Sequence, residues 1–368
     1  MDNSLGPKGQ FREKLTPLEA KAIDRGLSDF TGQSIGKDSI TAAQDFVGLV
    51  REKMVGRLAG DIDDYILLYY LCRHLQVSAE GDTLPHVEIG SLFGASSIVA
   101  LKGFRDGGKT VPLLCIDPLD GYYVHQQLGG TEDSISKLPI NRQTLDSNLA
   151  TFGFGDKDFS VLQHLSTDAK VSEFLKGKKI RSAYIDGDHS YEGLRYDWNL
   201  LAPLVVQNGW IVIDNVFDVG WPDVSRFIFE KLIDKNGWKF SLQLNRSLVL
   251  TRIEGEDDGP GRMEFVNTYR IFKKYWHSAQ HWHEVTKKSE EQETQIEDLN
   301  VKLKNETESF NKNLAAAHVN IESLHEQIKE TKGDVVRTQQ RLNATEMELS
   351  AYESLRLVRW LRRHFVKS

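Results

Sequence analysis

The chain has 368 residues, 40% of them hydrophobic, and a formal net charge of −7 at pH 7. This length allows one α/β domain of ordinary size with an accessory segment, and the negative charge excludes binding to nucleic acid by charge alone. The two cysteines, Cys72 and Cys115, lie in apolar runs. They indicate buried free thiols rather than a disulfide framework, so a reducing cytoplasm is expected. We see no apolar signal segment and no run long enough to span a bilayer.

The N-terminal region is mixed and charged. Its apolar spacing predicts helices around Pro17–Arg25 and Ala42–Leu58, and we interpret residues 1–60 as a helical cover. The following segment, Asp63–Gln76, is apolar on most faces and contains neither glycine nor proline. This composition predicts a helix that packs on a sheet.

A glycine-bearing loop follows the first predicted strand, Val87–Ile89. Gly90 and Gly94 allow the backbone to approach a ligand closely, and Ser96 is the expected N-cap of a helix through Lys102. The spacing is Glu-x-Gly-x-x-x-Gly, which differs from the G-x-G-x-x-G of dinucleotide-binding proteins. By itself this loop is weak evidence for a cofactor site.

An acidic residue ends the second predicted strand, Pro112–Asp117. An acid at the tip of strand two, beside a glycine loop at the tip of strand one, is suitably placed to bind a ribose diol. The long connection 118–158 contains a predicted helix near Asn141–Phe152 and is typical of a substrate loop or lid. A third strand, Phe159–His164, is followed by Ser166 and Asp168.

Two further apolar runs end in acidic or amide residues, which places five polar side chains at the carboxyl ends of buried strands. In an open α/β sheet, ligands bind at that edge. Hard oxygen donors together with one imidazole suit a divalent cation and a proton acceptor. Asp188 has three interpretations: a metal ligand, a residue that orients His189, or the cap of a following helix at Ser190–Asp197. The residues concerned are Asp186, Asp188, His189, Asp214 and Asn215.

The remaining elements of the domain are predicted in order. Helices are expected at Trp198–Val206 and Pro222–Lys235, and a terminal hairpin at Trp238–Leu244 and Ser247–Ile253. Aromatic residues recur at helical spacing in Met263–Glu284. That helix packs either on the domain or on a second subunit.

The C-terminal region has the pattern of a coiled coil. Apolar residues recur at every seventh position from Leu314 to Leu349, and three threonines occupy the partner positions of the seam. We therefore expect homo-oligomers of modest stability. The last segment is basic and amphipathic, and it either lies on an anionic membrane surface at the inner face or keeps the end of the coiled coil in solution. The predicted boundaries are 1–60, 61–254, 255–285 (linker and aromatic helix), 286–352 (coiled coil) and 353–368 (basic tail).

The glycine loop, the acid of the second strand and the two acidic strands resemble class I S-adenosylmethionine-dependent methyltransferases over residues 63–253. The run Ile-Asp-Gly-Asp-His-Ser-Tyr-Glu from Ile185 is similar to the metal-dependent branch related to macrocin O-methyltransferases. The resemblance implies a doubly wound, mostly parallel seven-stranded sheet with an antiparallel final hairpin, followed here by the coiled coil. It implies an O-methyltransferase of the EC 2.1.1 type that uses S-adenosylmethionine and Mg²⁺.

The resemblance also implies the role of each site residue. The metal would be held by Asp186, Asp214 and Asn215, and His189 would be the base. The metal lowers the pKa of an acceptor hydroxyl and the imidazole takes its proton. The implied acceptor is a sugar hydroxyl in glycan or natural-product biosynthesis. The implied cofactor positions are Glu88, Gly90, Ser91, Gly94 and Asp117, with Ser166 or Asp168 near the adenine.

Two other functions stay open at this point. The chain would be an interaction or scaffold protein of a surface-polysaccharide assembly complex if the coiled coil is its working part and the domain only binds cofactor. It would be a dinucleotide-dependent oxidoreductase or epimerase if the glycine loop binds NAD. The missing G-x-G-x-x-G disfavours the latter, and the intact acidic set with His189 disfavours the former.

Overall fold

The computed structural model describes residues 14–75, 84–120, 132–257 without 134, 259–276, and 326–349 without 328 and 348. The chain divides into two compact units, Met1–Gln280 and His281–Ser368. The sheet and the candidate site both belong to the first unit.

The described residues form one seven-stranded sheet in the spatial order β3-β2-β1-β4-β5-β7-β6. Strands β1 to β5 pair in parallel, and β7 runs antiparallel to both β5 and β6. This confirms the predicted mostly parallel sheet with an antiparallel final hairpin. The strands are β1 (His86–Ile89), β2 (Leu113–Ile116), β3 (Phe159–Leu162), β4 (Ile180–Ile185), β5 (Val205–Ile213), β6 (Trp238–Leu244) and β7 (Ser247–Arg252).

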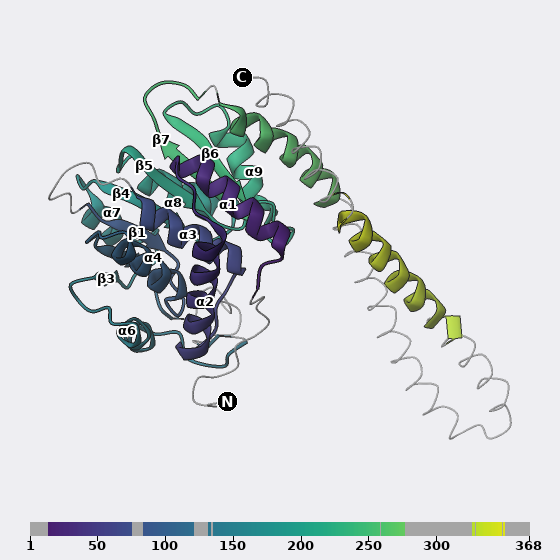
Figure 1. Cartoon of the computed structure of the whole chain (residues 1–368), viewed down its shortest axis with the longest axis horizontal. Coiled ribbons are helices and arrows are strands. Elements are labelled where there is room, and N and C mark those ends of the chain that lie inside the picture. The colour runs from purple at the N-terminus through teal and green to yellow at the C-terminus, as the bar shows by residue number, and fades with distance from the viewer. Residues whose placement is uncertain are drawn as a thin grey trace, which may run out of the picture. The chain divides into compact units, whose positions relative to one another are not determined.

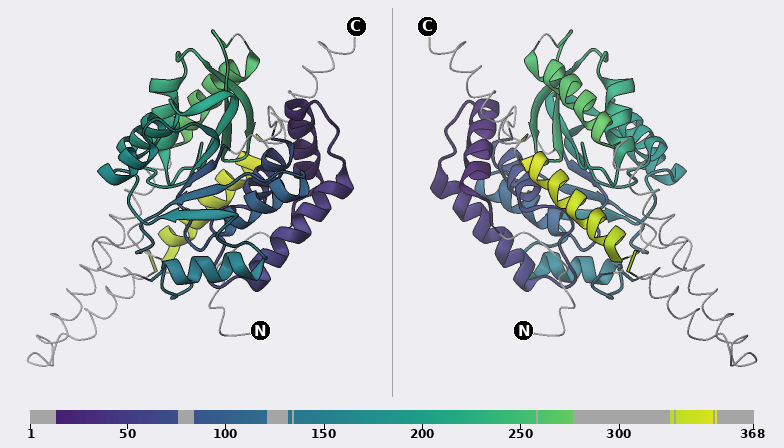
Figure 2. Two further views of the ribbon diagram at one scale, coloured as in Figure 1. Left: turned by 90° about the vertical axis from the view of Figure 1, so that its left-hand side faces the viewer. Right: turned by 90° about the vertical axis from the view of Figure 1, so that its right-hand side faces the viewer.

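Helices cover both faces of the sheet (Figures 1 and 2). Side chains alternate along each strand, so Trp210 and Val212 of β5 join the core on one face while Ile211 and Ile213 join the core on the other. The first face carries α1 (Pro17–Thr31), α2 (Lys37–Lys53), α3 (Ile62–His74), α4 (Ala95–Asp106) and α6 (Arg142–Thr151). The second carries α7 (Ala169–Leu175), α8 (Tyr191–Leu201), α9 (Pro222–Phe227) and a helix at 260–276.

The N-terminal helices belong to the first core. Leu27 of α1 and Val47 of α2 are fully buried there. Helix α2 begins and ends earlier than predicted, because the chain turns extended at Met54 and then passes through Gly56 at φ 86°. A Cβ at Gly56 would lie 2.5 Å from the Phe93 ring, so the connection between α2 and α3 packs directly on the glycine loop.

Two predictions about helix ends were wrong. Gly94, at φ 88°, is the N-cap of α4, so Ser96 lies inside the first turn instead of capping it. The expected helix Trp198–Val206 is also displaced: α8 already begins at Tyr191, and Val205 pairs with Ile180 in the sheet. Ser190 accepts a hydrogen bond from the Gly193 N–H at 3.0 Å, and this cap starts α8 early.

The last helices of the first unit differ from the prediction in helix type and in described length. The expected helix Pro222–Lys235 is α9 followed by a π-helical turn, η2 (Ile228–Leu232). The helix 260–276 buries Phe265, Tyr269 and Phe272 against the second core, so it packs on its own domain over its described length. The rest of the predicted segment, from residue 277 to Glu284, lies outside the described residues.

In the second unit, the described part of residues 326–349 is helical. The three seam threonines, Thr331, Thr338 and Thr345, each donate to the carbonyl oxygen four residues earlier, at 2.6, 2.8 and 2.8 Å. The remaining heptads of the predicted coiled coil and the basic tail lie outside the described residues. Within the described chain, every helix is too short or too polar to cross a membrane.

Candidate active site

The register of the parallel strands aligns the predicted site residues. Ile89 of β1 pairs with both Ile116 of β2 and Ile185 of β4, and Ile185 pairs with Ile213 of β5. The next residue of each strand therefore lies at one level of the carboxyl edge. The ladder continues through these residues, since the Asp186 N–H donates to Ile89 at 2.9 Å and the Asp214 N–H to Ile185 at 3.1 Å. The four aligned residues are Gly90, Asp117, Asp186 and Asp214.

Gly90 is required where β1 leaves the sheet. Its φ is 88°, and a Cβ there would lie 2.1 Å from the carbonyl oxygen of Asp186. A side chain at this position would therefore separate β1 from β4. The Gly90 N–H donates to the Ile116 oxygen at 3.1 Å, so the loop begins while the chain is still held between its neighbours.

Asp117 organises the glycine loop. Its Oδ2 accepts the N–H groups of Ser91 at 2.6 Å and Leu92 at 3.0 Å, and its Oδ1 accepts the Leu119 N–H at 2.8 Å. The side chain is fully buried. The direct contact with a ribose diol stays a prediction, and the observed contacts show that this carboxylate holds the loop in shape.

Glu88 is a buried acid beneath the same loop. Its Oε2 accepts a hydrogen bond from the Ser97 hydroxyl and lies 3.4 Å from the Ser91 hydroxyl. Its Oε1 is buried without a hydrogen-bond partner in the described chain. Burial raises the pKa of Glu88 to about 7, and the hydroxyls of Ser96 and Ser97 oppose this effect. A buried oxygen without a partner, beside a glycine loop, favours a ligand that brings a donor.

The imidazole of His189 is held by two contacts. Its Nε2 lies 3.1 Å from Asp186 Oδ1, and the Trp221 ring lies 4.9 Å from it, centroid to centroid. The neighbouring Asp188 is exposed and accepts the Ser190 N–H at 2.9 Å. Of the three interpretations of Asp188, this contact favours the one that stabilises the start of α8.

Asp214 is buried among other acids. Burial raises its pKa well above the ordinary value, and Asp186 and Asp64 raise it further. The Ser247 hydroxyl lies 3.1 Å from Asp214 Oδ1 and 2.9 Å from Asp64 Oδ1. One hydroxyl proton cannot serve both carboxylates. The two carboxylates therefore repel each other unless one of them holds a proton or a cation lies close, and Arg246 is one such cation.

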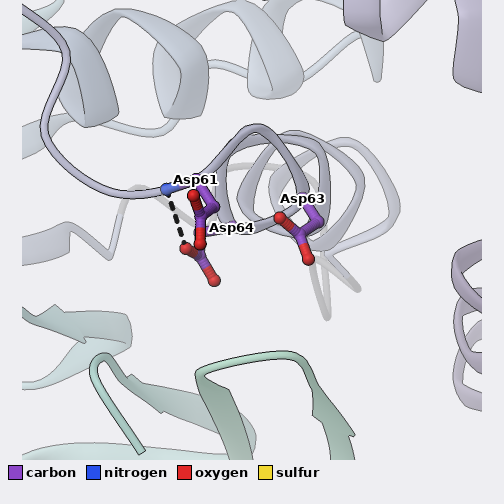
Figure 3. Close-up of side chains that lie close together, drawn as sticks. All are labelled: Asp61, Asp63 and Asp64. Atoms are coloured by element: carbon purple, nitrogen blue, oxygen red, sulfur yellow. Dashed lines mark hydrogen bonds between the residues drawn. The ribbon is translucent and has the colours of Figure 1, made fainter. Parts of the chain in front are cut away.

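Sequence reasoning missed the acids at the start of α3. Asp61, Asp63 and Asp64 each offer an oxygen within 4.8 Å of the others, and Figure 3 shows Asp61 and Asp64 joined by the hydrogen bond from the Asp61 N–H, at 3.2 Å. Asp63 and Asp64 are only 6% and 5% exposed. Burial and Asp63 raise the pKa of Asp64 to about 7. The signal available in the sequence was the group of acids at the start of an otherwise apolar helical run.

Arg246, in the turn between β6 and β7, is the cation that faces these acids in the described chain. It lies 3.3 Å from Asp61, 3.7 Å from Asp64 and 2.6 Å from Asp218. Asp218 also accepts from Asn215 Nδ2 at 3.2 Å, and Asn215 has the left-handed φ of 58°. One guanidinium is therefore shared among more carboxylates than it can neutralise.

The two residues predicted near the adenine follow β3. Asp168 caps α7 by accepting the Lys170 N–H at 2.9 Å, and its other oxygen lies 3.0 Å from His164 Nδ1. Ser166 is partly buried in the same loop. The described structure thus gives Asp168 a helix-capping contact and leaves its contact with a cofactor a prediction.

Comparison with known proteins gives three kinds of match. In a curated set, the chain is 26% identical over 196 residues to an uncharacterized protein of Acanthamoeba polyphaga mimivirus, which covers 52% of this chain and 76% of that protein. Among solved structures, the O-methyltransferase NovP is 15% identical with a TM-score of 0.42, covering 64% of this chain and 100% of NovP. The apo structure of CalS11, a TDP-rhamnose 3'-O-methyltransferase, is 15% identical with a TM-score of 0.39, covering 65% and 96%.

A third solved structure is the O-methyltransferase from Bacillus cereus in complex with SAH, 15% identical with a TM-score of 0.36 and covering 63% of this chain and 97% of that one. These structural similarities are too distant to carry function. A family model described as a methyltransferase domain matches residues 87–216, which run from β1 to the end of β5 and include the whole aligned edge. Residues 87–216 of this chain are a methyltransferase domain.

Proposed function

We propose that this protein is a metal-dependent O-methyltransferase that moves a methyl group from S-adenosylmethionine to a sugar hydroxyl. The observation that carries the proposal is the aligned edge. A glycine loop with its acid lies at one end of a row of strand ends, and a buried acidic cluster with one imidazole lies at the other. The methyltransferase domain match covers both ends.

The β1–β2 half of the edge fits S-adenosylmethionine. The loop turns at Gly90 and Gly94, which both have left-handed backbone, and Glu88 offers a buried oxygen that lacks a donor in the described chain. A cofactor with an ammonium group and a ribose diol supplies donors of this kind. Asp117 then acts on the cofactor through the loop that it holds.

The β4–β5 half fits a divalent cation. Asp186, Asp214 and Asn215 would hold it, with hard oxygen donors of the type that Mg²⁺ prefers. When bound, such an ion neutralises the acidic cluster and lowers the pKa of a nearby hydroxyl. The raised pKa of buried Asp214 supports this assignment, because a cation removes the repulsion from Asp186 and Asp64 that raises it.

The proton and the methyl group then move in opposite directions. Asp186 accepts Nε2–H of His189, which leaves the lone pair of the ring on Nδ1. The acceptor oxygen forms a bond to the methyl carbon while the bond between that carbon and the cofactor's sulfur breaks. The electron pair of the broken bond stays on sulfur, which gives S-adenosylhomocysteine. The hydroxyl proton passes to Nδ1 of His189, so the imidazole acts as general base.

A direct test measures methyl transfer from labelled S-adenosylmethionine to a panel of sugars, first in EDTA and then with Mg²⁺ restored. We expect transfer in Mg²⁺ and loss of transfer in EDTA, with S-adenosylmethionine binding by calorimetry in both. Full transfer in EDTA would remove the metal from the proposal, and absence of S-adenosylmethionine binding would remove the reaction itself.

The C-terminal helix supports a proposal of self-association. The seam threonines satisfy their hydroxyls within the helix, so they present methyl groups to a partner. Val335, at an apolar position of the same seam, is 40% exposed. A second copy of the chain would bury both in a coiled coil.

A further inference from the structure

A pocket lies between α9 with η2 and the helix 260–276. Its volume is about 250 Å³. This is below the range of about 300–1,000 Å³ typical of sites that enclose drug-sized ligands. The pocket therefore suits one ring of a larger molecule rather than the whole of it.

Two connections lead from one wall of this pocket to the candidate active site. Pro222 of its wall follows Trp221, whose ring contacts His189 at 4.9 Å. Glu230, also in the wall, accepts the Tyr191 hydroxyl at 3.0 Å, two residues after His189. A ligand in the pocket therefore lies next to side chains that touch or flank the base.

The other wall is connected to the loop after β5. Phe272 contacts Phe217 with ring centroids 5.5 Å apart, and Phe217 follows Asn215 by two residues. Tyr269 stacks on Phe229 at 4.4 Å. These rings form a rigid apolar backing, and the half-buried Trp276 completes it.

Charged groups of both signs form the rest of the lining. On α9 and η2, Arg226 lies 3.2 Å from Asp223 and its guanidinium lies 4.7 Å from the centre of the Tyr191 ring, so its direction is set before a ligand arrives. On the opposite helix, Lys273 is exposed and makes no ion pair within the described chain. The negative charges of two acids in the lining cancel the positive charges of Arg226 and Lys273, which disfavours a strongly charged ligand.

A π-helical turn forms part of the charged wall. Glu230 lies in η2, where the ladder of α9 widens, and such turns occur frequently at functional sites. The lining thus combines an aromatic surface with oriented donors and acceptors. A sugar ring matches both, because one face of it carries C–H groups and its rim carries hydroxyls.

We infer that this pocket binds a sugar ring of the acceptor, at a distance from the hydroxyl that receives the methyl group. The inference rests on the proposed function for the identity of the reaction. Binding energy from such a remote ring positions the reacting hydroxyl beside His189. The pocket therefore determines which glycoside is methylated.

Saturation-transfer NMR on the full-length protein in Mg²⁺ tests this, with methyl glycosides of glucose, galactose and mannose as probes. We expect transfer to the ring protons of at least one glycoside, and at least a tenfold weaker affinity in Lys273→Ala and in Trp276→Ala. Arg270→Ala is the matched control, because it removes an exposed positive charge from the same helix outside the pocket. It should bind like the wild type.

Different measurements would reveal failure of this inference and failure of the proposed function. Two results would overturn the assignment of this pocket and leave the proposed reaction standing. One is unchanged glycoside binding in both variants. The other is a wild type that binds S-adenosylmethionine but none of the glycosides. Loss of S-adenosylmethionine binding by calorimetry would overturn the reaction. If Trp276→Ala unfolds, Lys273→Ala still decides the matter, because its side chain is exposed.

Discussion

The two halves of the aligned edge each contain a buried aspartate at a strand end, but the surroundings of the two carboxylates differ. Asp117 and Asp214 both follow the last residue of a parallel strand, and both are buried. Asp117 receives three backbone N–H groups. Asp214 shares one hydroxyl with Asp64 and faces the charge of Asp186.

The difference shows how the strand-end position acquires its chemistry. A carboxylate that accepts several N–H groups is stable as an anion and becomes part of the scaffold. A carboxylate surrounded by other carboxylates is stable only with a proton or a cation. The loop that Asp117 holds is therefore formed without a ligand, whereas the acids around Asp214 are stable as a group only with a proton or a cation.

The largest effect should come from the base in the acidic half. His189→Ala should lower turnover by about 10²–10⁴, because a general base contributes on that order. S-adenosylmethionine affinity should change little, since the imidazole contacts Asp186 and Trp221 rather than the glycine loop. The residual rate should rise with pH as hydroxide replaces the base. Initial rates across pH measure this, and a variant with wild-type turnover and pH profile would leave His189 a structural residue.

The second test compares neutral replacements in the two halves, in EDTA. Asp117→Asn should destabilise the fold by roughly 1–3 kcal/mol, because the amide offers one acceptor oxygen for three N–H groups and turns a donor toward them. Asp214→Asn should leave stability unchanged or raise it, because it removes a buried acid whose anion is disfavoured by burial, by Asp186 and by Asp64. Urea unfolding measures both. Equal losses would mean that the halves do not differ as described.

Glu88 gives a pH-dependent test of the cofactor half. Its pKa is raised from 4.5 to about 7, so the folded state holds this proton more tightly than the unfolded state. Its contribution to stability is complete below about pH 4.5 and is lost as the pH rises toward 7, with a slope of up to about 1.4 kcal/mol per pH unit. Glu88→Gln should remove that part of the slope. Unfolding free energies from pH 4.5 to 7.5 measure it, and an unchanged slope in the variant would contradict the assignment.

The smallest effect on the edge should follow deletion of residues 286–368. Both halves lie in the first unit, so S-adenosylmethionine binding and turnover should stay within about twofold of the full chain. The oligomer should become smaller, because the seam that buries its apolar positions between chains is gone. Light scattering measures mass and labelled transfer measures activity. The same oligomer after truncation would assign assembly to the first unit.

Much of the fold could be predicted from local patterns. Runs of apolar residues ending in Gly90, Asp117, Asp186 and Asp214 predicted the parallel strands and their common edge, because buried strands and their terminating polar residues are local signals. The start of α4 was predicted less well, because Ser96 and Gly94 both suit an N-cap and the close contact of the loop with Leu145 selects the glycine. Helix ends depend on such contacts.

The sequence by itself determined the order of the strands along the chain, the glycine loop, and the acids and imidazole that follow β4 and β5. The tertiary structure alone decided which charges meet. Asp64 and Asp214 are brought to one hydroxyl on Ser247 because α3 packs across the sheet to β7. The N–H groups of Ser91 and Leu92 turn to Asp117 because Gly90 lets the loop fold back. Periodicity reports which face of a strand or helix is buried, but long-range packing sets the distance between charges, and that distance decides whether an acid serves as scaffold or as ligand.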